Sequence, residues 1–198
     1  MPHTHRSSKA AESKKTMDLT LVKFLVTNKQ KISHSLAVDR ILDLATPLLR
    51  SGDGEGAERL FRQALTLEPN KMDLLNNLAA SLSLQGREAE ATLLMEVLHY
   101  QHPDYLFART GLAKAAMRKG DLQQAQALLE PLYERRKFHV SEYDALCATQ
   151  IDLLLLQNDP ISAKTWFKMW EACNPENPRL NPYRTLFKSE VLEDDYVP

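Results

Sequence analysis

Two stretches, GDGEGAERLFRQALTLEP at residues 52–69 and GREAEATLLMEVLHYQHP at residues 86–103, are aligned copies of one pattern. Each begins with a glycine and ends with a proline, and Pro103 follows Pro69 by 34 residues. The apolar positions between these ends also match: Ala57, Phe61 and Ala64 in the first copy correspond to Ala91, Met95 and Leu98 in the second. A fixed period of this length predicts helical units that stack in a row.

The pattern continues along the chain. The third copy holds Gly120, Ala125, Leu129 and Leu132, and the fourth, which starts four residues late, holds Asn158, Ala163, Phe167, Trp170 and Pro175. A second helix precedes each turn, with Ile41, Leu44, Ala45 and Leu48 in the first repeat matched by Leu75, Leu78, Ala79 and Leu82 in the next. Apolar residues three and four apart are typical of helices. We therefore predict an all-α fold of about four antiparallel helix pairs.

The small residues of the pattern have a physical role. Alanines at equivalent positions of both helices, such as Ala79 and Ala91, allow two helices to approach closely. The glycine before each second helix suits a tight turn with a positive φ angle, and the closing proline ends that helix. One pair cannot bury its apolar face alone, so we expect neighbouring pairs to share a continuous core.

These residues resemble the tetratricopeptide repeat (TPR) family over about residues 38–177. The resemblance implies a right-handed α-solenoid whose concave face is lined by the first helix of each pair. It also implies that the chain acts as a protein-binding adaptor or scaffold, which holds a peptide or a partner's helix on that face.

The third and fourth repeats depart from the family pattern. Arg109 occupies a column that usually holds a large apolar residue, and Lys137 stands where the closing proline belongs. We expect a linker at His139–Tyr143 before the fourth repeat, and an offset between the third and fourth pairs.

We divide the chain into three parts. Residues 1–31 carry seven Lys or Arg against two acidic residues, and we expect a largely disordered basic arm with a possible helix or strand at 17–26. Residues 32–177 form the repeat domain. Residues 178–198 hold a capping helix at about 182–192 and an acidic tail at 193–195.

The composition does not indicate a charged partner. The 25 basic and 26 acidic residues nearly cancel, so we expect neither nucleic acid nor a membrane as the partner. Cys147 and Cys173 lack the spacing of a zinc site or a disulfide framework, and we interpret both as reduced thiols. No run of 18 apolar residues and no secretory signal is present, so we expect a cytoplasmic protein.

Motifs for catalysis are missing. The sequence has no phosphate-binding loop, dinucleotide fingerprint, nucleophile elbow or His-Glu-x-x-His helix, so we predict that the chain is not an enzyme and needs no cofactor. His99 and His102 have a spacing that could chelate a metal, but with no third ligand nearby we expect an exposed helix end instead. Trp166 is a candidate for an aromatic peptide cradle, whereas Phe167 and Trp170 fall in core columns.

The candidate site comes from placing the sequence on the family's concave face. The predicted ligand-binding residues are Arg50, Asn76, Asn77, Thr110, Lys114 and Arg118. Thr110, Lys114 and Arg118 are four residues apart, so they follow one face of a helix as a basic ladder. Amides and cations suit an acidic or C-terminal peptide. The fourth repeat adds Ala148, Asp152 and Leu156 to the same face.

Two narrower functions stay open. The clamp with which chaperone-binding family members grip a C-terminal carboxylate is absent, because its positions hold Leu42, Thr46, Phe107 and Gly111. A secretion-type chaperone for one partner subunit is one alternative, by analogy with small family members. A regulatory subunit that docks through the basic N-terminal arm is the other.

Overall fold

The computed structural model describes residues 25–27 and 32–189. The helices in this part are α1 (Leu36–Ser51), α2 (Gly54–Leu67), α3 (Met72–Leu84), α4 (Glu88–Gln101), α5 (Leu106–Arg118), α6 (Leu122–Leu129), α7 (Val140–Leu156), α8 (Pro160–Cys173) and α9 (Asn181–Ser189). Two 3₁₀ helices, η2 (Glu130–Glu134) and η3 (Pro178–Leu180), and two strands, β1 (Leu25–Thr27) and β2 (Lys137–His139), complete it. None of the described helices is long and apolar enough to cross a membrane.

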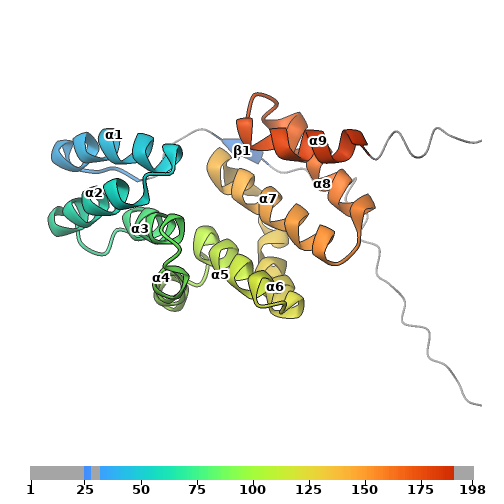
Figure 1. Ribbon diagram of the computed structural model, residues 1–198, viewed down its shortest axis with the longest axis horizontal. Helices are drawn as coiled ribbons and strands as arrows, with labels where there is room; N and C mark the ends of the chain where they lie inside the picture. Colours follow the sequence, from blue (N-terminus) through green and yellow to red (C-terminus); the bar gives the residue numbers. More distant parts are fainter. Residues whose placement is uncertain (1–24, 28–31, 190–198) are drawn as a thin grey trace, which may run out of the picture.

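The helices form four successive antiparallel pairs, α1/α2, α3/α4, α5/α6 and α7/α8 (Figure 1). Each pair packs on the next, so the molecule is built by repetition along one direction. The short helix α9 follows the fourth pair and packs at its end. This arrangement confirms the predicted all-α helical repeat with a C-terminal capping helix.

The glycines predicted to form tight turns have positive φ angles, as expected. Gly52, Gly86 and Gly120 have φ angles of 88°, 73° and 77°. In the fourth repeat Asn158 takes this place with a φ of 57°. Glycine enters this left-handed region without a steric penalty, and asparagine is among the residues that tolerate it.

Small side chains allow the helices of adjacent pairs to approach closely. Ala57, Ala91, Ala125 and Ala163 are all buried at the equivalent position of the four repeats. Gly54, at the start of α2, lies so near α3 that an added Cβ would be 2.7 Å from the carbonyl oxygen of Ser81. Contacts this short leave no room for a larger residue.

The apolar core has two parts. One is built from α1 to α4 and includes Phe61, Leu74, Met95 and Leu98. The other is built from α5 to α9 with β2, and its largest buried side chains are Trp170, Tyr143 and Phe138. The division falls between the second and third pairs, where Ala108 of α5 packs with the first part.

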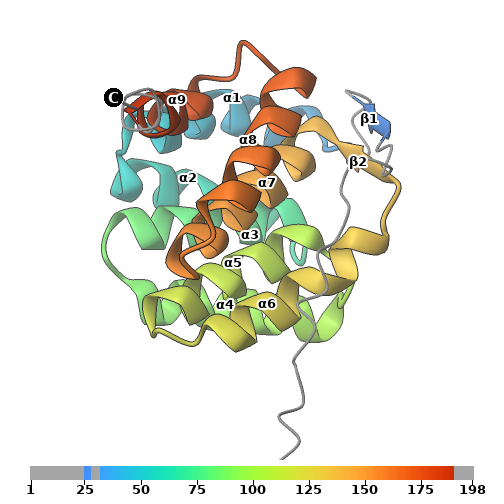
Figure 2. The ribbon, with the colours of Figure 1, turned by 90° about the vertical axis from the view of Figure 1, so that its right-hand side faces the viewer.

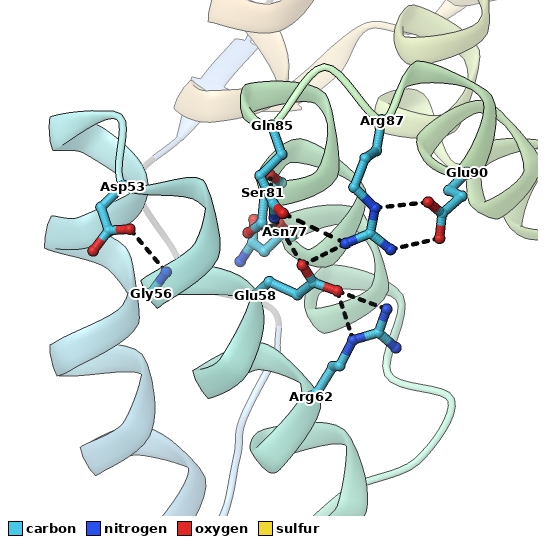
Figure 3. A network of polar contacts seen from close by, with 9 residues as sticks. All are labelled: Asp53, Gly56, Glu58, Arg62, Asn77, Ser81, Gln85, Arg87 and Glu90. Atoms are coloured by element: carbon cyan, nitrogen blue, oxygen red, sulfur yellow. Dashed lines mark hydrogen bonds and ion pairs between the residues drawn. The ribbon is translucent and has the colours of Figure 1, made fainter.

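A polar network connects the first two repeats at the surface (Figure 3). The carboxylate of Glu58 on α2 accepts hydrogen bonds from Gln85 at 2.7 Å and from Arg87 at 2.8 Å. It also pairs with Arg62 one turn along α2, at 2.7 Å. Arg87 uses its remaining donors for Glu90, at 2.6 Å. The turn before α4 is therefore attached to the helix of the preceding pair.

The predicted linker at His139–Tyr143 is wrong. Residues up to His139 form strand β2, and α7 begins directly at Val140. The His139 ring nitrogen accepts the N–H of Ser141 at 3.3 Å, while the carboxylate of Glu142 accepts the N–H of His139 at 2.9 Å. This reciprocal cap starts the helix without a linker. Strand pairing with a distant segment explains the extended residues, and repeat spacing carries no sign of it.

The strand β1 is that distant segment. Figure 2 shows it beside β2, where the chain enters α7. The two strands are parallel, with Val26 opposite Phe138. The element predicted at 17–26 thus ends in a strand, while the rest of it, most of the basic arm and the acidic tail at 193–195 lie outside the described residues.

Candidate functional site

A groove follows the inner side of the repeats and consists of two hollows that share Asn76 and Phe107. The first hollow encloses about 580 Å³ between α3, α4 and α5, with Ala145 and Arg179 at its far side. The second encloses about 670 Å³ and extends past Asn77 to the start of α7. Both volumes are in the range of ligand sites.

The structure brings five of the six predicted ligand-binding residues to this groove. Asn76, Thr110, Lys114 and Arg118 line the first hollow, and Asn76 and Asn77 line the second. Arg50 lines neither hollow, because it is exposed at the C-terminal end of α1. The repeat frame thus turns the predicted residues of α3 and α5 toward these hollows, while the predicted residue of α1 lies outside them.

The basic ladder is not a uniform surface. Thr110 is only 4% exposed, and its hydroxyl donates to the carbonyl oxygen of Phe107 within its own helix. Arg118 is exposed and pairs with Glu88 of α4 at 2.7 Å. The three members of the ladder therefore differ, since Thr110 is buried and bonded within α5 and Arg118 is engaged in an ion pair.

Lys114 is the member of the ladder with an unusual environment. It is partly buried at the floor of the first hollow, and the described residues give its ammonium group no ion pair or hydrogen bond. Burial lowers the pKa of Lys114, and the positive charges of Arg179 and Arg118 lower it further against the opposing carboxylate of Asp152. A desolvated cation beside other cations attracts anions.

Arg179 was missed by the sequence analysis. It belongs to η3, beyond the last predicted repeat, yet it lines the first hollow opposite α3 and α4. Its guanidinium lies over the ring of Trp170, 5.9 Å from the ring centre. Only the position of η3 in space brings it to the groove, so no local pattern could have indicated its role.

The fourth repeat contributes less to the open face than expected. Ala148 is buried, and the carboxylate of Asp152 accepts a hydrogen bond from the Tyr183 hydroxyl at 2.6 Å. These two expectations are wrong because the C-terminal segment covers this part of α7. The Tyr183 hydroxyl supplies the partner that a half-buried carboxylate requires.

Trp166 is not a peptide cradle. Its side chain is 3% exposed and packs against Tyr133, with the ring centres 5.9 Å apart. It is as much a core residue as Phe167 and Trp170, which are buried as predicted. The eight-residue α6 and the 3₁₀ helix η2 bring Tyr133 to it, a local shape that the repeat pattern does not contain.

The described histidines and cysteines are not arranged as a metal site. No group of three His, Cys, Asp or Glu side chains suited to a metal ion occurs in residues 25–27 and 32–189. His102 is exposed, whereas His99 is partly buried and its Nδ1 has no hydrogen-bond partner among the described residues. The exposed helix end predicted for this pair is thus wrong for His99. Both cysteines are free, Cys147 buried and Cys173 exposed.

The sequence matches no protein-family model and no curated protein. The structure resembles solved tetratricopeptide structures. One is the Sgt2 TPR domain from Aspergillus fumigatus, with 19% identity over 76% of this chain and 90% of that chain, and a TM-score of 0.44. A tetratricopeptide repeat protein from Parabacteroides merdae has 16% identity over 74% of this chain and 57% of that chain, and a TM-score of 0.43.

The chain is TPR-like in fold. This statement rests on its own helix pairs, on the interval of 34 residues between Gly52 and Gly86, and on the left-handed residue before each second helix. Repeats of this kind are general protein-interaction modules.

Proposed function

We propose that this chain is a binding module, without enzymatic activity, that holds an extended segment of a partner protein in the groove between α3, α5 and α7. The observation that carries the proposal is that the two hollows are neighbours. Both are lined by Asn76 and Phe107, so together they offer an elongated surface, which suits an extended peptide better than a compact metabolite.

The side chains along the groove match the needs of a peptide. The amides of Asn76 and Asn77 offer donors and acceptors for a backbone that has no partner strand of its own. Phe107 and Leu84 offer apolar contact. The cations at one end favour a segment with an acidic residue or a free C-terminus. We propose an adaptor or scaffold role on this basis.

The free thiols support a reducing location. Cys173 is exposed and unpaired with another cysteine, and such thiols persist in compartments where disulfides are rare. We therefore propose that the chain works in the cytoplasm.

The test is to fill the groove without disturbing the fold. Ala80 is partly exposed and lines the first hollow, whereas Ala127 is exposed on α6 and lines neither hollow. Peptides selected from a displayed random library on the wild-type protein serve as probes, and fluorescence anisotropy measures their affinity. Ala80→Trp should weaken binding at least tenfold, while Ala127→Trp should leave it unchanged.

Either of two results would overturn the proposal. If selected peptides bind the Ala80→Trp protein as tightly as the wild type, while circular dichroism shows the same helix content, the groove is not the binding surface. Failure to select any peptide from several independent libraries would also contradict it.

A further inference from the structure

The first hollow contains a cation that the fold does not use. Lys114 is partly buried, and no described carboxylate pairs with its ammonium group. Desolvating a charge without a partner is unfavourable, and such groups are normally paired when buried. Lys114 therefore costs the folded state free energy. A residue of this kind is expected where a ligand supplies the missing charge.

A second cation comes from a different part of the chain. Arg179 of η3 lines the same hollow, and its side chain forms no ion pair within the described residues. Its contact with the face of Trp170 holds the guanidinium beside the hollow. Lys114 on α5 and Arg179 in the C-terminal segment thus line the same hollow, and each carries a cationic hydrogen-bond donor.

The charges around the hollow determine the sign and the size of the charge that its ligand should carry. Arg118 and Glu88 compensate each other as an ion pair. Asp152, whose charge acts on Lys114, is held by the Tyr183 hydroxyl and offsets one of the two remaining cations. One net positive charge remains, which suits a monoanion with two oxygen acceptors.

We propose that Lys114 and Arg179 form a subsite for a carboxylate of the bound segment. This inference rests on the proposed function, because it names the chemistry that the groove recognises in its partner. The carboxylate accepts hydrogen bonds from the ammonium and the guanidinium, which are the donors that bind such groups most strongly. An acidic side chain and a free chain end share this chemistry.

The first experiment uses a small probe and does not depend on any peptide. Thermal unfolding is measured in sodium acetate and in sodium chloride of equal ionic strength, because a ligand that binds only the folded state raises Tm. Acetate should raise the Tm of the wild type above its value in chloride. The difference should be smaller in Lys114→Met and in Arg179→Met, and unchanged in Lys168→Met, which removes an exposed lysine outside both hollows.

The second readout separates a binding residue from a structural one. Lys114→Met keeps the side-chain length and removes the unpaired charge, so its Tm in chloride should be higher than that of the wild type. A residue that holds the fold together would give the opposite result. If Lys114→Met has a lower Tm than the wild type in chloride, or if acetate raises the Tm of the wild type and of Lys114→Met equally, the subsite does not exist. Lys114→Gln serves as the second variant for the same comparison.

Peptides selected for groove binding distinguish the two carboxylate sources and the two proposals. Replacing a glutamate by glutamine, or amidating the chain end, should weaken binding at least tenfold for the group that occupies the subsite. The same change should have no effect on Lys114→Met. If peptides lose affinity in Ala80→Trp but bind Lys114→Met and Arg179→Met normally, the subsite is refuted while the groove proposal stands.

Discussion

The Nε2 atom of His34 lies 2.7 Å from a carboxylate oxygen of Asp73, which attaches the segment before α1 to the start of α3. The other ring nitrogen, Nδ1, lies 2.7 Å from the carboxylate of Glu68. Only 2% of the His34 side chain is exposed. An imidazole between two carboxylates satisfies both as a donor only when it is protonated.

This contact predicts a pH-dependent stability. Burial lowers the pKa of His34, but the hydrogen bonds to Glu68 and Asp73 outweigh it, so the pKa is raised above its ordinary value of 6.5. The stabilisation is therefore complete below about pH 6.5 and is lost as pH rises through the raised pKa. A hydrogen bond from the backbone N–H of Ser35 and another from the His34 ring lower the pKa of Glu68 from 4.5 to about 2. The stability that Glu68 contributes is therefore lost only as pH falls below 4.5.

Urea unfolding at pH 5.5 and pH 8 measures this effect. The wild type should have the larger free energy of unfolding at pH 5.5. His34→Gln, which cannot be protonated, should reduce this difference, and His102→Gln, at an exposed histidine, should leave it unchanged. An unchanged pH dependence in His34→Gln would contradict the assigned role.

The spacing of the repeats predicts opposite outcomes for two alanines of the same helix. Ala91 is 4% exposed where α4 packs against its neighbours, whereas Ala89, the second residue of α4, is exposed. Ala91→Leu should lower the free energy of unfolding by about 1 to 3 kcal/mol, because overfilling a close contact strains it. Ala89→Leu should change it by less than about 0.5 kcal/mol. Equal values in urea unfolding would mean that the repeat frame is misplaced.

One hydroxyl links the C-terminal cap to α7. Tyr183 donates to Asp152 at 2.6 Å, and burial raises the pKa of that carboxyl group. Tyr183→Phe leaves a partly buried acceptor without this donor and should cost about 1 to 3 kcal/mol of stability. Tyr100 is 88% exposed, so Tyr100→Phe is the matched control with no expected change. Equal stability of both variants would show that the hydroxyl does not hold the cap.

The sequence carried the information for the fold because its signals are local. A residue that must adopt a positive φ reveals a turn wherever it stands, as at Gly52 and Asn158. Periodic alanines likewise reveal close helix contacts. The strand pair is different, since Val26 meets Phe138 across more than a hundred intervening residues. Nothing near either residue indicates its partner.

The site was predictable to the extent that the repeat frame governs it. The frame brings Asn76 and Lys114 to the groove because it fixes which side of each helix faces inward. It does not include contacts within a helix or between distant segments. For that reason it could not show that the Thr110 hydroxyl donates to a carbonyl of its own helix, that Glu88 pairs with Arg118, or that Arg179 lines the groove.

The location of a bound peptide is the most direct test of the central claim. The outer face of α4 is the strongest competing surface, because Leu93 and Tyr100 are 60% and 88% exposed there. Backbone amide chemical shifts of the isotope-labelled protein are measured during titration with a selected peptide. The groove account predicts the largest changes around Asn76, Phe107 and Lys114. Changes concentrated on the outer face of α4, with these three residues unaffected, would contradict it.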